Sequence, residues 1–177
     1  TERLKIEIDY YKNLCDYAVE TLKLISIDRS ELQKRVNFLN PELIARFTDR
    51  GQSVILLSSH TFNWEWLIAA GSISLPAPVD FVYQPVKNSF FDMFMREARA
   101  RFGAHPVKRN ELARELIKRK NIVRGIAVVA DQYPGHGNDK RHLAQFLGQD
   151  TVFFYGSQQM ATLTQAPVLY AVVKKMK

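Results

Sequence analysis

The stretch "SVILLSSHTFNWEWLIAAGS", residues 53–72, joins a strand-like run to a helix-like run within twenty positions. Its first five residues, SVILL, are typical of a strand buried on both faces, which is the usual environment in a parallel sheet. The segment from Asn63 onward has the composition of a helix, and Asn63 stands where a helix N-cap is favoured. The stretch therefore predicts a strand, a connecting loop and a helix, the repeating unit of α/β proteins.

The same alternation continues along the chain on the C-terminal side of this stretch. Further strands are predicted at 79–83, 104–109, 125–131 and 166–173. Helices are predicted between them at 88–103, starting from an Asn88 cap and stopping at Gly103, and at 110–121 and 157–165. We expect an α/β fold with a mixed, mostly parallel central sheet and helices on both faces.

The N-terminal quarter of the chain is helical in pattern. Apolar residues at steps of three and four give residues 2–25 one apolar face, and two shorter helices are expected at 30–38 and 40–47, the second with Asn40 as N-cap and Pro41 in its first turn. A chain of 177 residues, 46% of them hydrophobic, suits one domain. We predict a single domain over 1–177, with N-terminal helices in 1–48 and an α/β core in 51–177, cut at both ends from a longer protein.

Composition narrows the range of partners. Lys and Arg exceed Asp and Glu by 25 to 18, so the net charge is +7 and anionic partners are favoured. Nucleic acid, an acidic protein and a phospholipid surface all satisfy this charge. The single cysteine, Cys15, excludes an intrachain disulfide, and no apolar run is long enough to cross a bilayer. The amphipathic helix at 2–25 and the basic charge predict reversible binding to an anionic membrane surface.

The loop after the first strand carries the clearest chemical pattern. In open α/β sheets, ligands bind where strands end and helices begin, and that rule places His60 at such a position. Glu65 lies in the first turn of the next helix, where the helix dipole favours its anionic form. A carboxylate that holds an imidazole in one tautomer is the arrangement needed to take a proton from a hydroxyl nucleophile. We therefore predict that His60 is a general base oriented by Glu65.

Four blocks in order resemble one known family. They are "HTFNWE", "VYQPVKNSFFDMFMREARARFG", "VVADQ" and "FLGQDT", within residues 36–173. Together they resemble the late acyltransferases of lipid A biosynthesis, the lauroyl and myristoyl acyltransferases, within the wider group of H-x4-D/E glycerolipid acyltransferases. The resemblance implies transfer of a fatty acyl group from an acyl carrier protein thioester to a hydroxyl of a lipid A precursor. It implies no cofactor and a place at the cytoplasmic face of the bacterial inner membrane, peripheral or through an anchor absent from this chain.

The resemblance also implies roles for particular residues. His60 matches the base and Glu65 its partner, and Asn63, Arg99 and Asp131 match positions expected to bind substrate. Lys108 and Arg109 are added from their position between a strand and a helix start, where phosphates bind readily.

Other functions fit parts of the sequence. One is a glycerolipid acyltransferase of the lysophospholipid type, and another is a basic domain that binds lipid or nucleic acid without catalysis. No nucleic-acid motif is recognisable, so nucleic acid is not an expected partner. Ser58 and Ser59 adjoin His60, but the G-x-S-x-G elbow of serine hydrolases is missing. His105, His136 and His142 match no metal-ligand spacing, so no metal is predicted.

Overall fold

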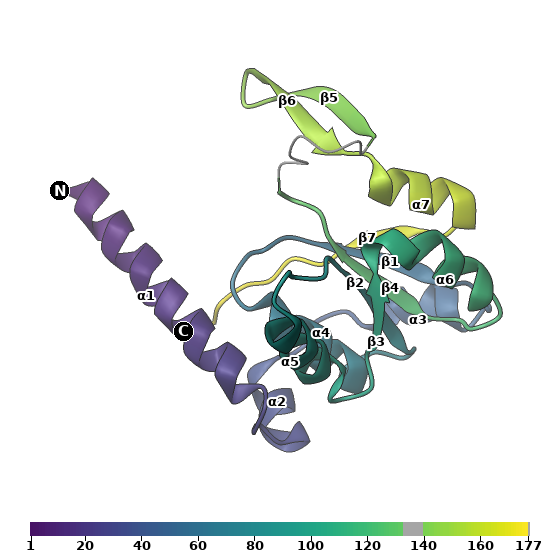
Figure 1. Ribbon diagram of the computed structural model, residues 1–177, viewed down its shortest axis with the longest axis horizontal. Coiled ribbons are helices and arrows are strands. Elements are labelled where there is room, and N and C mark those ends of the chain that lie inside the picture. Colours follow the sequence, from purple (N-terminus) through teal and green to yellow (C-terminus); the bar gives the residue numbers. More distant parts are fainter. Residues whose placement is uncertain (133–139, 177) are drawn as a thin grey trace.

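The computed structural model describes residues 1–132 and 140–176, and its centre is a five-stranded sheet (Figure 1). The strand order is β3-β2-β4-β1-β7, and every neighbouring pair is parallel. The strands are β1 (Val54–Ser58), β2 (Val79–Tyr83), β3 (His105–Lys108), β4 (Gly125–Val129) and β7 (Val168–Tyr170). The predicted α/β class is confirmed, and the central sheet, predicted to be mixed and mostly parallel, has only parallel pairs among its five strands.

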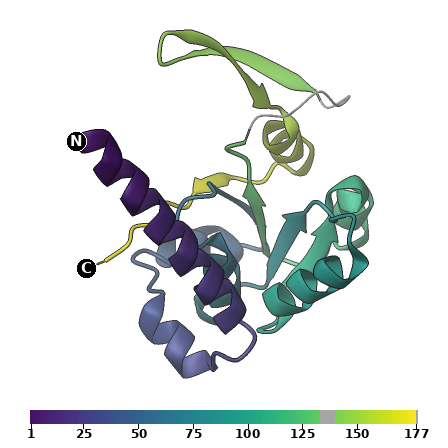
Figure 2. The same cartoon turned by 60° about the vertical axis from the view of Figure 1, so that its left-hand side comes forward.

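Helices connect the strands and cover both faces of the sheet (Figures 1 and 2). They are α1 (Glu2–Lys23), α2 (Arg29–Arg35), α3 (Glu42–Thr48), α4 (Trp64–Ser74), α5 (Ser89–Ala100), α6 (Leu112–Lys118) and α7 (Gly156–Thr164), with a 3₁₀ turn at Arg109–Glu111. On one face α4 packs against α1, α2 and α5 in a buried apolar cluster that includes Leu24, Leu32, Trp66, Ala69 and Ala98. On the other face Ile55 and Ile126 of the sheet are buried together with Met160 of α7, and Leu112 and Leu116 of α6 pack against them.

The register of the two central strands determines where their loops begin. Ser58 of β1 pairs with Val129 of β4, and the backbone N–H of Ala130 donates to the Ser58 carbonyl at 3.2 Å. His60 and Asp131 each lie two residues beyond that pair. Neighbouring parallel strands end at the same edge of a sheet, so two loops that are 71 residues apart in sequence begin side by side.

Several element boundaries differ from the sequence-based predictions. Asn63 and Asn88 cap α4 and α5 as expected, each side chain accepting from a backbone N–H of the first turn. The predicted cap at Asn40 is wrong, because Pro41 holds the N-cap position of α3. Asn110 is not a cap either, since it lies inside the 3₁₀ turn and α6 starts two residues later.

An antiparallel hairpin was not predicted. It consists of β5 (Arg141–Phe146) and β6 (Gln149–Phe154), joined at Leu147 and Gly148, which both have positive φ. It extends away from the sheet in both views (Figures 1 and 2). The helix α1 also projects, and none of its residues is buried. Along the described ranges, no helix is both long and apolar enough to cross a membrane.

Candidate active site

His60 and Asp131 form a hydrogen-bonded pair at the carboxyl end of the sheet. The Nδ1 atom of His60 lies 2.7 Å from Oδ1 of Asp131, and the His60 backbone N–H donates to Oδ2 at 2.9 Å. Both side chains remain partly accessible, at 27% for His60 and 39% for Asp131. The Asp131 carboxylate is therefore hydrogen-bonded to both the ring and the backbone of His60. The imidazole remains accessible to a substrate.

The charge state of Asp131 determines the tautomer of His60. Partial burial acts to raise the pKa of Asp131, but hydrogen bonds from the imidazole and backbone N–H of His60 outweigh it. The pKa therefore lies below its ordinary value of 3.8. An ionised carboxylate can only accept hydrogen bonds, so Nδ1 of the neutral ring carries the proton and Nε2 carries the lone pair. This is the tautomer that a general base requires.

Glu65 has a different partner from the one predicted. Its carboxylate is 1% exposed and accepts two hydrogen bonds from Arg99, Nε to Oε2 at 2.5 Å and Nη2 to Oε1 at 2.6 Å. The prediction that Glu65 orients His60 is therefore corrected, because the carboxylate on Nδ1 belongs to Asp131. Burial acts to lower the pKa of Arg99, but the contact with Glu65 outweighs it and the pKa lies above its usual value.

Helix α1 supports this region through contacts that the sequence did not indicate. The Tyr17 ring stacks on Trp64 at 4.5 Å, and Trp64 meets His60 edge-on at 4.8 Å. The Tyr17 hydroxyl also approaches Oε1 of Glu65 at 3.5 Å, and burial together with that carboxylate raises the pKa of Tyr17. Asn63, predicted to bind substrate, donates instead to Glu20 at 2.8 Å while its oxygen caps α4.

A cleft of about 1160 Å³ opens beside His60 and continues across the α6/α7 face of the sheet. Its middle is apolar, with Ile126 and Val128 as the floor, Leu112 and Leu116 on one wall and Met160 on the other. Arg99 and Trp64 also line the cleft near His60. The arrangement places an accessible base at one end of a long apolar groove.

A comparison with protein families gives a match over almost the whole chain. The sequence model of the family described as "Bacterial lipid A biosynthesis acyltransferase" matches residues 1–174. The chain belongs to this family of acyltransferases. No curated protein matches the chain.

The remaining predicted residues of this acyltransferase lie at different distances from the cleft. Arg109 lines it, and its guanidinium lies 5.1 Å from the centre of the Phe154 ring at the base of the hairpin. Lys140 lines it as well and was not predicted. Lys108 is not a lining residue and lies 4.0 Å from Glu111 on the neighbouring turn. The structure thus brings Arg99 and Arg109 to the cleft with His60, and places Lys108 and Asn63 outside it.

The two serines beside His60 have local partners. Ser58 is buried, and its hydroxyl donates to the carbonyl of Ala171 at 3.1 Å. The Ser59 hydroxyl is 2.5 Å from that of Thr61. The histidines weighed as metal ligands are dispersed: His105 contacts Glu115 at 3.6 Å, His142 lies in β5, and His136 falls outside the described residues.

Proposed function

We propose that this acyltransferase moves a fatty acyl group from an acyl carrier protein thioester to a hydroxyl of a lipid A precursor, with His60 as general base and Asp131 as its orienting partner. The observation that carries this proposal is the 2.7 Å contact between His60 Nδ1 and Asp131 Oδ1 beside an apolar cleft. It supplies a base in the correct tautomer next to a space suited to an alkyl chain.

The reaction is a direct transfer. Nε2 of His60 takes the proton of the acceptor hydroxyl while that oxygen attacks the thioester carbonyl. The tetrahedral intermediate collapses, the carbon–sulfur bond breaks, and the imidazolium returns its proton to the departing thiolate. Asp131 stabilises the imidazolium between these two proton transfers. Ser58 and Ser59 take no part, so no acyl-enzyme forms.

Arg99 and Arg109 are proposed to bind the anionic parts of the substrates. Both line the cleft that contains His60. Guanidinium groups bind phosphate through paired hydrogen bonds, and the acceptor and the carrier-protein arm both carry phosphate. Lys140 also lines this cleft and adds a third positive charge to it.

The enzyme is proposed to work at an anionic membrane surface, the cytoplasmic face of the bacterial inner membrane. Exposed apolar residues on α1 include Leu4, Ile8, Tyr11 and Leu14, and the net charge is +7. Each Lys or Arg near an anionic surface contributes on the order of 1 kcal/mol to binding. Binding to anionic vesicles should therefore weaken as salt rises, and binding that ignores both lipid charge and salt would contradict the proposal.

His60→Ala tests the proposed chemistry. General-base catalysis supplies about 10²- to 10⁴-fold in rate, so turnover should fall by that factor while the protein stays folded. His105→Ala is the matched control. His105 is the first residue of β3, at the amino end of the strand, and it does not line the cleft. Transfer should be measured from acyl carrier protein thioesters to a lipid A precursor and, in parallel, to a lysophospholipid. Wild-type turnover by folded His60→Ala would overturn the proposal, and a preference for the lysophospholipid would correct the acceptor.

A further inference from the structure

The positive charge of the chain is concentrated in one short segment around α6. Residues 105–124, from β3 to the loop before β4, contain seven Lys and Arg against two Glu, so they carry +5 of the net +7. Residues 1–104 are balanced, with thirteen basic and thirteen acidic residues. The rest of the surplus lies in 125–177 and includes Lys175, which pairs with Asp16 of α1 at 3.0 Å. The segment around α6 is therefore a basic region separate from the one beside α1.

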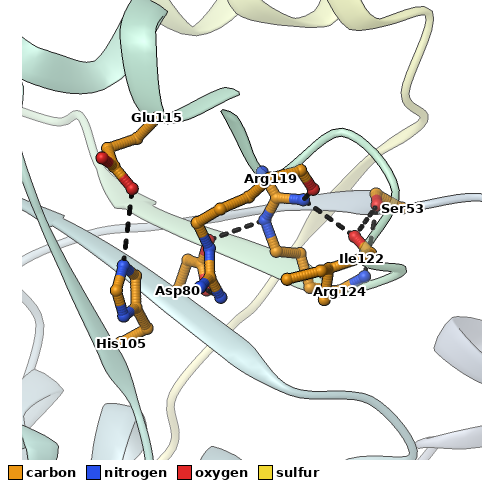
Figure 3. Close-up of polar contacts among 7 residues, drawn as sticks. All are labelled: Ser53, Asp80, His105, Glu115, Arg119, Ile122 and Arg124. Carbon is orange, nitrogen blue, oxygen red and sulfur yellow. Dashed lines mark hydrogen bonds and ion pairs between the residues drawn. The ribbon is translucent and has the colours of Figure 1, made fainter. Parts of the chain in front are cut away.

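Part of this charge points into the protein (Figure 3). The guanidinium groups of Arg119 and Arg124 approach the carboxylate of buried Asp80 at 2.9 and 2.6 Å. The side chain of Glu115 is only 16% exposed, and its carboxylate lies 3.6 Å from the His105 ring on β3. These contacts hold two of the arginines and one of the two glutamates away from the outer surface. The basic residues that remain outside therefore face solvent with little acidic charge among them.

The outer face of α6 presents basic side chains around an exposed isoleucine. Arg114, Ile117 and Lys118 are three and four residues apart, so they are neighbours on one helix face. The side chains of Arg114 and Lys118 are each 73% exposed, and Ile117 is 71% exposed. Both basic residues pair with a glutamate three positions earlier, at 3.6 and 3.7 Å, but exposed pairs of this kind are weak and are screened by salt. With Lys120, exposed just beyond the helix, these residues form what we call the basic rim: Arg114, Ile117, Lys118 and Lys120.

The basic rim borders the cleft on the side of the sheet away from α1. Ile117 and Lys120 line the cleft that contains His60, whereas Arg114 and Lys118 stand outside its lining. Helix α6 packs on one face of the sheet, and α1 contacts α4 on the other (Figures 1 and 2). The exposed apolar residues of α1 lie on that other side. An enzyme held on a membrane through α1 therefore presents the basic rim to the aqueous phase.

We infer that the basic rim is the docking surface for the soluble protein that carries the acyl thioester, an inference that rests on the proposed function. The charge of the rim requires an acidic face on this partner, and Ile117 provides an apolar contact at the centre of that face. Opposite charges steer the two proteins together, so association is fast at low salt and slows as salt rises. From this position the thioester arm enters the cleft past Ile117 and Lys120, while the acceptor lipid approaches from the membrane.

Charge reversal at the two outer residues tests the docking surface without changing the cleft lining. Arg114→Glu combined with Lys118→Glu should raise the KM for an acyl carrier protein thioester about tenfold and leave kcat near wild type. The kcat/KM for acyl-pantetheine, a small thioester with the same acyl chain, should not change, because this substrate needs no protein docking. Arg29→Glu combined with Lys34→Glu is the matched control, since it makes the same change of charge at exposed positions on or beside the other face of the sheet, in α2. The control should leave both substrates at wild-type values.

A direct binding measurement keeps the inference separable from the proposed function. Binding of acyl carrier protein without an acyl group, followed by calorimetry, should weaken by the same factor in the reversed variant and depend less on salt than in the wild type. Arg114→Gln combined with Lys118→Gln removes the charges without reversing them and should give a smaller effect in the same direction. Binding that follows this pattern without any acyl transfer would support the basic rim and refute the proposed function. Acyl transfer with an unchanged carrier KM in both folded double variants would overturn the inference and leave the proposed function intact.

Binding to vesicles tests whether the basic rim contacts a membrane instead. Vesicles of phosphatidylcholine with phosphatidylglycerol should bind the wild type and the reversed rim variant equally, because the rim faces the aqueous phase when α1 lies on the membrane. Equal vesicle binding together with a raised carrier KM would support the inference. Loss of vesicle binding in the rim variant, with the carrier KM unchanged, would overturn it and assign this surface to the membrane.

Discussion

Asp131 and Glu65 are two carboxylates near the cleft that differ in their exposure to solvent and in the charge of their partners. Asp131 follows a strand, keeps 39% of its side chain accessible and binds an imidazole that can change its charge. Glu65 lies in the first turn of α4, is 1% accessible and binds a guanidinium that is always charged. A partner that titrates can take part in proton transfer, whereas a permanently charged buried pair holds structure in place. The sequence motif joins His60 to Glu65, and the fold joins it to Asp131.

The largest expected effect comes from reversing the hydrogen bond at Asp131. In Asp131→Asn, the amide oxygen can still accept from the His60 backbone N–H, which leaves the NH₂ group facing Nδ1. The ring must then accept at Nδ1 and carry its proton on Nε2, the wrong tautomer for a base. We expect acyl transfer to fall about 10²- to 10⁴-fold in a variant that still folds. Retained turnover would show that this pair does not act in the reaction.

Glu65→Gln should act first on stability. Removing the charge leaves Arg99 poorly compensated in a buried site, which destabilises a protein by about 3 to 5 kcal/mol. Glu31→Gln is the matched control, since Glu31 and Arg35 form an exposed pair on α2 worth about 0.5 kcal/mol or less. Denaturant unfolding measures both. Turnover per folded molecule should also fall in Glu65→Gln, because Arg99 lines the cleft and loses the carboxylate that holds it. Equal losses of stability in Glu65→Gln and Glu31→Gln would show that the buried pair is no more important than the exposed one.

Acid should remove the difference in unfolding free energy between wild type and Asp131→Asn. The pKa of Asp131 is lower in the folded protein than its ordinary value of 3.8. The charged carboxylate therefore stabilises the fold above pH of about 4, and this contribution is lost as pH falls through the depressed folded pKa. Unfolding free energies measured from neutral pH downward should converge for the two proteins as the pH falls through the depressed pKa of folded Asp131. A difference that grows on acidification would reverse the sign of the argument.

Tyr17→Phe should have the smallest effect. It removes a long hydroxyl contact to Glu65 at 3.5 Å and keeps the ring that stacks on Trp64 at 4.5 Å. We expect a loss of about 0.5 to 1 kcal/mol in unfolding free energy. Tyr17→Ala removes the stack as well and should destabilise the contact between α1 and α4 further. If Phe and Ala are equally damaging, the hydroxyl rather than the ring supports α1.

The sequence predicted which segments form the strands of the central sheet and which form helices. It also predicted that His60 follows the first strand. Apolar runs such as 54–57 and 125–129 mark strands, and Asn63 and Asn88 mark helix starts, because these signals are local. The hairpin was missed although its turn, Leu147 followed by Gly148, resembles the two-residue turns of hairpins. Its strands lack the strict alternation of a half-buried sheet, and all their residues are exposed or half-buried.

The partner of His60 depends on strand order, which the sequence does not display. β1 and β4 are neighbours although β2 and β3 intervene in the chain, and only this neighbourhood brings Asp131 to His60. The burial of Glu65 did leave a sequence signal. Glu65 and Ala69 are four residues apart on one helix face, and Trp66 and Ala70 continue that buried face. A carboxylate there needs a buried cation, which Arg99 supplies from α5.

The most direct test of the central claim is the tautomer of the neutral His60 ring, read from the nitrogen NMR shifts of Nδ1 and Nε2. The account predicts a proton on Nδ1 and a bare Nε2 in the wild type. It predicts the same pattern in folded Glu65→Gln, and transfer of the proton to Nε2 in Asp131→Asn. A His60 tautomer that changes in Glu65→Gln and survives in Asp131→Asn would contradict the account and return the orienting role to Glu65.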